Sequence, residues 1–159
     1  MKKLLLGLLF CPLFMFGQNV AKVDISNIPF GVNVAVVSGI DADSCFSKIV
    51  SAIKSQGLFF DRIDKENGII TTARRLTHDR YFDSYCLQVY LEKNELQVRM
   101  YSVYAADGSG PLPSLDQIYN SDTRFDKRAF SYLAYWAEKI GEVSKGKVVY
   151  KKEYNSMNN

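Results

Sequence analysis

The chain has 159 residues, of which 47% are hydrophobic and 23% are charged, and a formal net charge of +3. The first 18 residues carry two of the 20 Lys and Arg residues and none of the 17 acidic residues, so 18 basic and 17 acidic groups follow them. A nearly neutral remainder does not favour a polyanion, so we expect no nucleic-acid partner. Its length of about 140 residues fits one domain with its own core.

The N-terminal segment has the pattern of a secretory signal peptide. Lys2 and Lys3 form a basic start, and an apolar run then extends to a small residue, Gly17. We expect cleavage near Gly17 or Gln18, so that residues 1–18 are removed and the protein is exported, to the periplasm or the extracellular space.

Two other interpretations of this segment remain open. A membrane anchor would need about 20 apolar residues, and the apolar run over residues 4–16 is shorter than that, so we expect no integral membrane span. A lipoprotein would be acylated at Cys11, but bulky Phe10 stands where a lipoprotein cleavage site has a small residue.

We expect a single α+β domain over residues 19–154 and a flexible tail over residues 155–159. Apolar residues at helical spacing predict helices over residues 42–56 and 124–140. Asp41 or Asp43 caps the first helix. The second begins at a Thr123–Asp126 capping box and stops at Gly141. The remaining periodic segments predict strands over residues 20–28, 32–37, 58–63, 69–76, 85–91, 96–100 and 147–150. Residues 105–121 have no clear period and predict a long loop.

The hairpin over residues 85–101 has a predictable register. If Lys93 and Asn94 form a two-residue turn, every apolar residue of one strand faces an apolar residue of the other. The apolar pairs are Leu91 with Leu96, Val89 with Val98 and Leu87 with Met100. The other face then pairs Tyr90 with Gln97, Gln88 with Arg99 and Cys86 with Tyr101.

Two segments carry a family resemblance. They are the turn and strand over residues 64–70 and the hairpin with its Glu92-Lys93-Asn94-Glu95-Leu96 tip and Tyr104. They resemble small exported bacterial domains of unknown function that have a TATA-binding-protein-like fold, and the resemblance covers residues 40–140. The elements predicted above already give the order strands, helix, four strands, helix, and two helices with one apolar stripe each need one apolar face of an antiparallel sheet. The resemblance implies a curved sheet covered by helices, as in a TATA-binding-protein-like fold. It implies no known activity.

The polar sheet face opposite the helices is the first candidate site. Gln88, Tyr90, Arg99 and Tyr101 share it, and Arg with aromatic residues is a combination enriched at protein interfaces. The alternative is a solvated face of amphipathic cross-strand pairs. Tyr132, Tyr135 and Trp136 flank the second helix, and we expect them at the edge of the core.

A basic cluster is the second candidate site. Arg74, Arg75 and Arg80 lie near Asp79 and Asp83, so they form either an anion or acidic-glycan site or ordinary cross-strand ion pairs. His78 is the only histidine, and we expect it on a solvated turn rather than in a catalytic set.

We therefore expect an exported, non-enzymatic binding or accessory module whose ligand is a protein or a glycan. The alternative is a hydrolase with a carboxylate site that the sequence does not reveal. No cofactor and no metal site are expected. Cys45 and Cys86 are predicted to lie on opposite sides of the sheet and to remain unbonded, with Cys86 reactive if it is uncovered.

Overall fold

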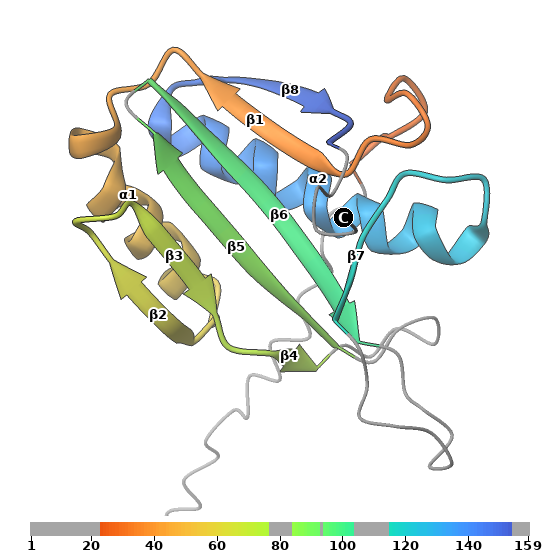
Figure 1. The fold of residues 1–159 in the computed structure, drawn as a ribbon, viewed down its shortest axis with the longest axis horizontal. Helices are drawn as coiled ribbons and strands as arrows, with labels where there is room; N and C mark the ends of the chain where they lie inside the picture. The colour runs from red at the N-terminus through yellow and green to blue at the C-terminus, as the bar shows by residue number, and fades with distance from the viewer. Residues whose placement is uncertain (1–22, 77–83, 93, 104–114, 154–159) are drawn as a thin grey trace, which may run out of the picture.

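The computed structural model describes residues 23–76, 84–92, 94–103 and 115–153, and the predicted signal peptide, His78, Asp79, Arg80, Asp83 and the C-terminal tail lie outside them. Its elements form one antiparallel sheet with two helices, so the α+β class is confirmed (Figure 1). In chain order the elements are β1 (Val34–Ser38), α1 (Ala42–Ser55), β2 (Phe60–Asp64), β3 (Ile69–Thr72), β4 (Arg75–Leu76), β5 (Ser84–Glu92), β6 (Glu95–Val103), β7 (Leu115–Gln117), α2 (Arg124–Ser144) and β8 (Lys147–Lys151).

The strands follow the order β2-β3-β5-β6-β1-β8, with β4 paired to β5 and β7 paired to β6. The predicted hairpin is confirmed, because β5 and β6 pair Leu91 with Leu96 and Leu87 with Met100. Strand β1 inserts between β6 and β8 and pairs antiparallel with both. The N-terminal and C-terminal parts of the domain thus lie side by side in the sheet.

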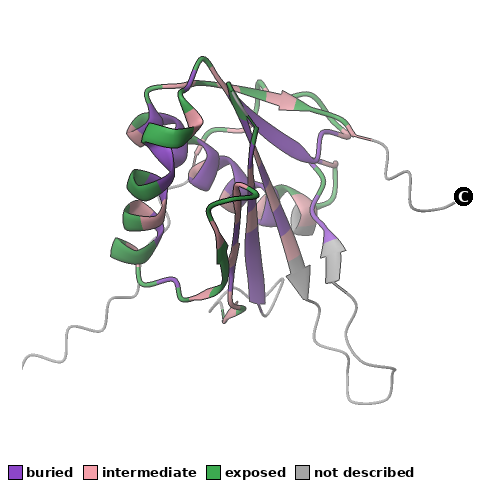
Figure 2. Cartoon of the chain, turned by 60° about the vertical axis from the view of Figure 1, so that its left-hand side comes forward, coloured by how far each residue is buried: buried purple, intermediate pink, exposed green. Residues whose placement is uncertain are grey.

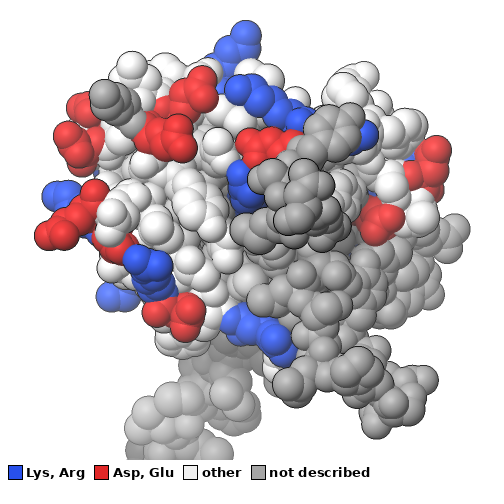
Figure 3. Space-filling model, viewed as in Figure 1, with Lys and Arg blue, Asp and Glu red and all other residues white. Residues whose placement is uncertain are grey.

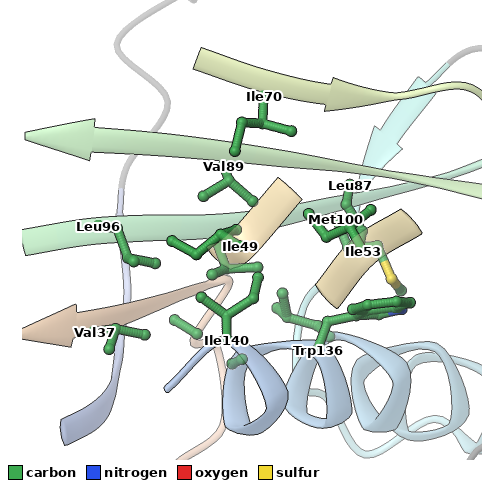
Figure 4. Packing of buried hydrophobic residues seen from close by; sticks show 14 of the residues in the cluster. Val37, Ile49, Ile53, Ile70, Leu87, Val89, Leu96, Met100, Trp136 and Ile140 are labelled. Carbon is green, nitrogen blue, oxygen red and sulfur yellow. The ribbon is translucent and has the colours of Figure 1, made fainter. Parts of the chain in front are cut away.

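Both helices cover the same face of the sheet, which is the far face in Figure 1. Helix α1 contributes Ile49 and Ile53 to a core shared with Trp136 and Ile140 of α2 (Figure 4). The buried residues concentrate in the central strands, and the exposed ones lie along the outer sides of the helices (Figure 2). Removing these apolar side chains from water is the main force that holds the helices on the sheet.

The helix ends differ in part from the sequence prediction. Asp41 is the N-cap of α1, but its side chain makes no capping hydrogen bond. Thr123 does cap α2, since its hydroxyl accepts from the Asp126 backbone N–H at 3.0 Å, as the capping box predicts. The predicted stop at Gly141 is wrong, because α2 continues to Ser144. Gly141 instead permits close packing, since a Cβ there would lie 2.7 Å from Val148 of β8.

Two predicted segments are corrected. The described part of the predicted strand over residues 20–28 is a turn, in which Asp24 accepts from the Ser26 N–H at 2.9 Å and competes with strand formation. The predicted loop over residues 105–121 contains β7. Its Asn120 is buried and donates from Nδ2 to the carbonyl of Ile28 at 2.8 Å.

The single strand predicted over residues 69–76 is divided into β3 and β4. The Leu87 N–H donates to the Thr72 hydroxyl oxygen at 2.9 Å instead of to a backbone carbonyl. The Ala73 N–H donates to the Phe59 carbonyl at 2.9 Å. These two bonds interrupt the pairing with β5, which a pattern of apolar residues does not show.

The turn between β2 and β3 predicts an acid-sensitive contribution to stability. Asp64 accepts hydrogen bonds from the Asn67 side chain at 2.9 Å, the Asn67 N–H at 3.0 Å and Arg62 at 2.6 Å. These bonds, led by that of the Asn67 side chain, lower the pKa of Asp64 from 3.8 to about 2. The unfolded chain therefore binds this proton at higher pH than the folded chain does.

We expect the stabilisation from Asp64 to be complete above about pH 4 and to be lost as the pH falls to about 2. In urea unfolding series from pH 7 to pH 2, the free-energy difference between wild type and Asp64→Asn should shrink across this window. Parallel pH profiles for the two proteins would contradict the assignment.

Candidate functional site

Strand alternation places one set of side chains on the sheet face opposite the helices, here called the open face. In the β5–β6 register Gln88 pairs with Arg99 and Tyr90 pairs with Gln97. Their neighbours Leu87, Val89 and Val98 enter the core. The open face thus carries the residues that the hairpin pattern predicts, here called the polar patch: Gln88, Tyr90, Gln97, Arg99 and Tyr101.

The polar patch is a connected network. The Tyr90 hydroxyl donates to Gln88 Oε1 at 2.7 Å, and Arg99 Nη2 donates to Gln97 Oε1 at 2.9 Å. The Arg99 guanidinium lies 5.7 Å from the Tyr90 ring centroid, within the range of a cation–π contact. These contacts fix the direction of the Arg99 side chain.

Arg99 also forms an ion pair with Glu153, which follows β8. The exposed fraction is 22% for the Arg99 side chain and 32% for that of Glu153, so solvent only partly screens the pair. Arg99 Nε is buried and has no hydrogen-bond partner among the described residues. Leaving a buried donor unpaired costs about 1–3 kcal/mol, so this N–H is a position where a ligand acceptor would be favoured.

Glu153 is held in place by its backbone. Its N–H donates to Asn33 Oδ1 at 2.8 Å, and its carbonyl accepts from Asn33 Nδ2 at 3.1 Å. Asn33 is fully buried. The sequence prediction missed both residues. The alternation of β8 was a usable signal, because the exposed Lys147, Val149 and Lys151 continue at the same spacing to residue 153.

Gln117 and Tyr101 extend the polar patch toward β7. They are register partners across β6 and β7. Gln117 Nε2 donates to the Asn33 carbonyl at 3.3 Å, whereas its buried Oε1 has no partner among the described residues. Burial raises the pKa of Tyr101, although the Arg99 charge beside it opposes the shift, so Tyr101 stays a neutral hydroxyl.

The structure separates the two described arginines of the predicted basic cluster. Arg75 is half-buried in β4 and donates from Nη1 to the Gln56 carbonyl at the end of α1, at 2.8 Å. Arg74 is exposed, and its charge acts on the thiol of Cys86. Arg80 and the other members lie outside the described residues, so the anion-site hypothesis stays a prediction.

Cys45 and Cys86, the two cysteines among the described residues, are both free, as predicted. Cys45 is buried in α1, where its thiol lies 3.7 Å from the Ser144 carbonyl. Cys86 is 8% exposed, and burial raises the pKa of its thiol. Burial therefore disfavours the reactive thiolate form of Cys86.

Tyr132 and Tyr135 are partly buried against the core, as expected for residues at its edge. The expectation is wrong for Trp136, which is 2% exposed and lies within the core because both α1 and the sheet pack against it.

Two hollows lie away from the polar patch. A groove of about 800 Å³ runs between the outer sides of α1 and α2, lined by Ser51, Lys139 and Glu142 among others. A smaller hollow of about 240 Å³ holds Asp43 and Glu66 near the start of α1. The part of the chain that the structure describes contains no group of three His, Cys, Asp or Glu side chains placed to hold a metal ion.

Both edges of the sheet carry features that oppose pairing with another strand. At one edge, β2 has a register irregularity between Phe60 and Arg62. At the other, β8 exposes Lys147 and Lys151. Bulges and edge lysines are the means by which natural sheets avoid edge-to-edge association. The open face is therefore a better candidate for a binding surface than the edges are.

Charge on the side of the molecule that carries the open face is mixed. Figure 3 shows this side, on which the basic and acidic groups of the described residues are interspersed.

Comparison with known proteins gives no family assignment. No protein-family model matches the chain, and no curated protein matches it. Among the described helices, none has the length and apolar character needed to cross a membrane.

Proposed function

We propose that this protein is an exported binding module that engages a protein or glycan partner through the polar patch. The observation that carries the proposal is that the buried Nε–H of Arg99 lacks a hydrogen-bond partner among the described residues. Arg99 lies within a network of Tyr and Gln side chains. Arg and Tyr are the residue types that dominate binding energy at interfaces when they are fixed and partly desolvated.

Export and the finer fold assignment belong to the same proposal. The basic start and apolar run of residues 1–18 support a secretory signal, with residues 19–154 as the mature domain. The antiparallel sheet with both helices on one face supports a TATA-binding-protein-like fold. In that arrangement neither helix covers the face that carries the polar patch.

The proposal is tested with a photo-crosslinking amino acid at Gln88, introduced in the exporting cell. We expect adducts from Gln88 that disappear in the Arg99→Ala/Tyr101→Ala variant, and none from Lys48 on the exposed side of α1. The double variant should lose only about 1–2 kcal/mol of stability, because both side chains are partly exposed and lie outside the core. Equal adducts from the two positions, or none from Gln88, would reject the polar patch as the binding surface.

A further inference from the structure

We propose that the polar patch recognises the carboxylate of an acidic, extended peptide, and that Glu153 occupies this carboxylate position in cis. This inference rests on the proposed function and names the chemical class of its partner. It starts from what the open face already holds, which is the Glu153 carboxylate on Arg99. The segment that presents this carboxylate is itself a peptide, fixed through its backbone by Asn33.

The donor geometry of Arg99 fits a second, better-placed carboxylate. Nε and Nη2 lie on the same edge of a guanidinium and together form a fork that matches the two oxygens of a carboxylate. Glu153 and Gln97 both contact Nη2, whereas Nε has no partner among the described residues. A carboxylate bound to both nitrogens would satisfy the buried Nε–H that Glu153 leaves unpaired.

The surroundings of Arg99 orient an acidic ligand. Val34 of β1 pairs with Lys151 of β8. The next residue, Ala35, pairs with Val98 of β6, and this antiparallel register places Val34 opposite Arg99. Lys151 and Arg99 therefore lie in the same row across the open face. The acidic Glu92 and Glu95 pair with each other at the hairpin tip. At about 3.3 Å per residue, Glu95 lies about 13 Å along β6 from Arg99. An acidic ligand is thus attracted to the Arg99 row and repelled from the tip.

The carboxylate that Arg99 already binds belongs to a peptide segment, and this favours a peptide over a glycan as the ligand. Gln117 Oε1 is a buried acceptor without a partner among the described residues, and it lies on the strand beside Tyr101. A peptide supplies a backbone N–H for this acceptor and a side-chain carboxylate for Arg99. Asn33 already pairs with both the N–H and the carbonyl of one residue, Glu153, so the carboxylate now on Arg99 is presented by a fixed peptide backbone.

Glu153 then weakens binding by competition. A group tethered by a short chain acts at an effective concentration in the millimolar range, so a free carboxylate must displace it. Glu153→Gln retains the size and backbone of the residue while it removes the competing charge. We expect this variant to bind an acidic peptide about tenfold more tightly than wild type, with the gain limited by the partial exposure of the ion pair.

The test is fluorescence anisotropy with labelled hexaglutamate, with hexaglutamine as the uncharged peptide and hexagalacturonate as the acidic glycan. Hexaglutamate should bind Glu153→Gln about tenfold more tightly than wild type. In the Glu153→Gln background, Arg99→Lys should lose most of this affinity, because lysine keeps the charge but not the fork. Lys48→Gln, a change of charge on exposed α1, should leave the affinity unchanged.

Three outcomes would overturn the inference. They are equal affinity of wild type and Glu153→Gln, equal binding of hexaglutamate and hexaglutamine, and tighter Arg99-dependent binding of hexagalacturonate than of hexaglutamate. None of these outcomes changes the crosslinking result at Gln88. Crosslinking without binding of hexaglutamate would mean that the open face binds a different ligand. The absence of crosslinking would mean that the open face is not the binding surface.

Discussion

Replacing Trp136 by alanine is expected to destabilise the protein by about 3–5 kcal/mol, the usual loss for a large aromatic residue in a core. Trp136 is 2% exposed and lies between α2 and the sheet (Figure 4). Its Nε1–H donates to the Tyr85 hydroxyl at 3.4 Å, and its ring contacts that of Tyr135 edge-on at 5.6 Å. Alanine removes all of these contacts and leaves a cavity that the rigid sheet cannot fill.

The free energy of unfolding of a domain is about 5–15 kcal/mol, and this loss is a large share of it. Much of the variant should therefore be unfolded at a modest denaturant concentration. Phe59→Ala is the matched control, because Phe59 is 81% exposed and its truncation should change stability by no more than about 0.5 kcal/mol. Trp136 is the only tryptophan, so circular dichroism in urea is the appropriate measurement. A loss below about 1.5 kcal/mol for Trp136→Ala would contradict its place in the core.

The parts of the fold that the sequence predicts are those in which one periodic pattern decides the outcome. The β5–β6 register follows from alternation alone, because a shift by one residue would turn Leu87 and Val89 to the open face. Helix α1 follows in the same way from a single apolar stripe that includes Ile49 and Ile53. In both elements local preference and burial agree.

The parts that the sequence did not predict depend on contacts between distant residues. Gly141 has the residue type of a helix stop, yet its role is set by Val148 of β8, which packs where a side chain would be. Asn120 has the residue type of a loop, yet it is buried because it binds the carbonyls of Ile28 and Pro29. No local pattern contains these partners.

The candidate site likewise has one part that the sequence predicts and one part that depends on contacts between distant residues. The members of the polar patch on β5 and β6 could be placed from alternation. The ion pair of Arg99 with Glu153 joins residues 54 positions apart, and the bonds of Asn33 with Glu153 span 120 positions. They exist because β1 inserts between β6 and β8, a crossover that only the assembled sheet shows.

The tight turn between β2 and β3 predicts the second large effect, in which Gly68→Ala destabilises the protein far more than Gly57→Ala does. Both glycines have a positive φ, +65° at Gly68 and +73° at Gly57, so alanine is strained at either position by about 1–2 kcal/mol.

Only Gly68 lies against another strand. A Cβ there would overlap the Leu91 carbonyl oxygen and approach Leu91 Cβ to 3.2 Å, whereas a Cβ at Gly57 meets nothing within 4 Å. The overlap cannot be relieved by a side-chain rotation, because the Leu91 N–H donates to the Gly68 carbonyl at 2.7 Å and holds β5 against the turn. Relief requires a shift of β5, and such overpacking costs about 1–3 kcal/mol.

We therefore expect Gly57→Ala to lose about 1–2 kcal/mol from backbone strain alone and Gly68→Ala to lose about 2–5 kcal/mol from strain and overlap together. Urea unfolding of the two variants beside wild type measures the difference. Gly39→Ala, with φ of +75° and nothing within 4 Å, should repeat the smaller loss and so verify the contribution of strain. Equal losses at Gly68 and Gly57 would mean that β5 yields to the added methyl group, and that the turn does not fix the position of the strand that carries Gln88 and Tyr90.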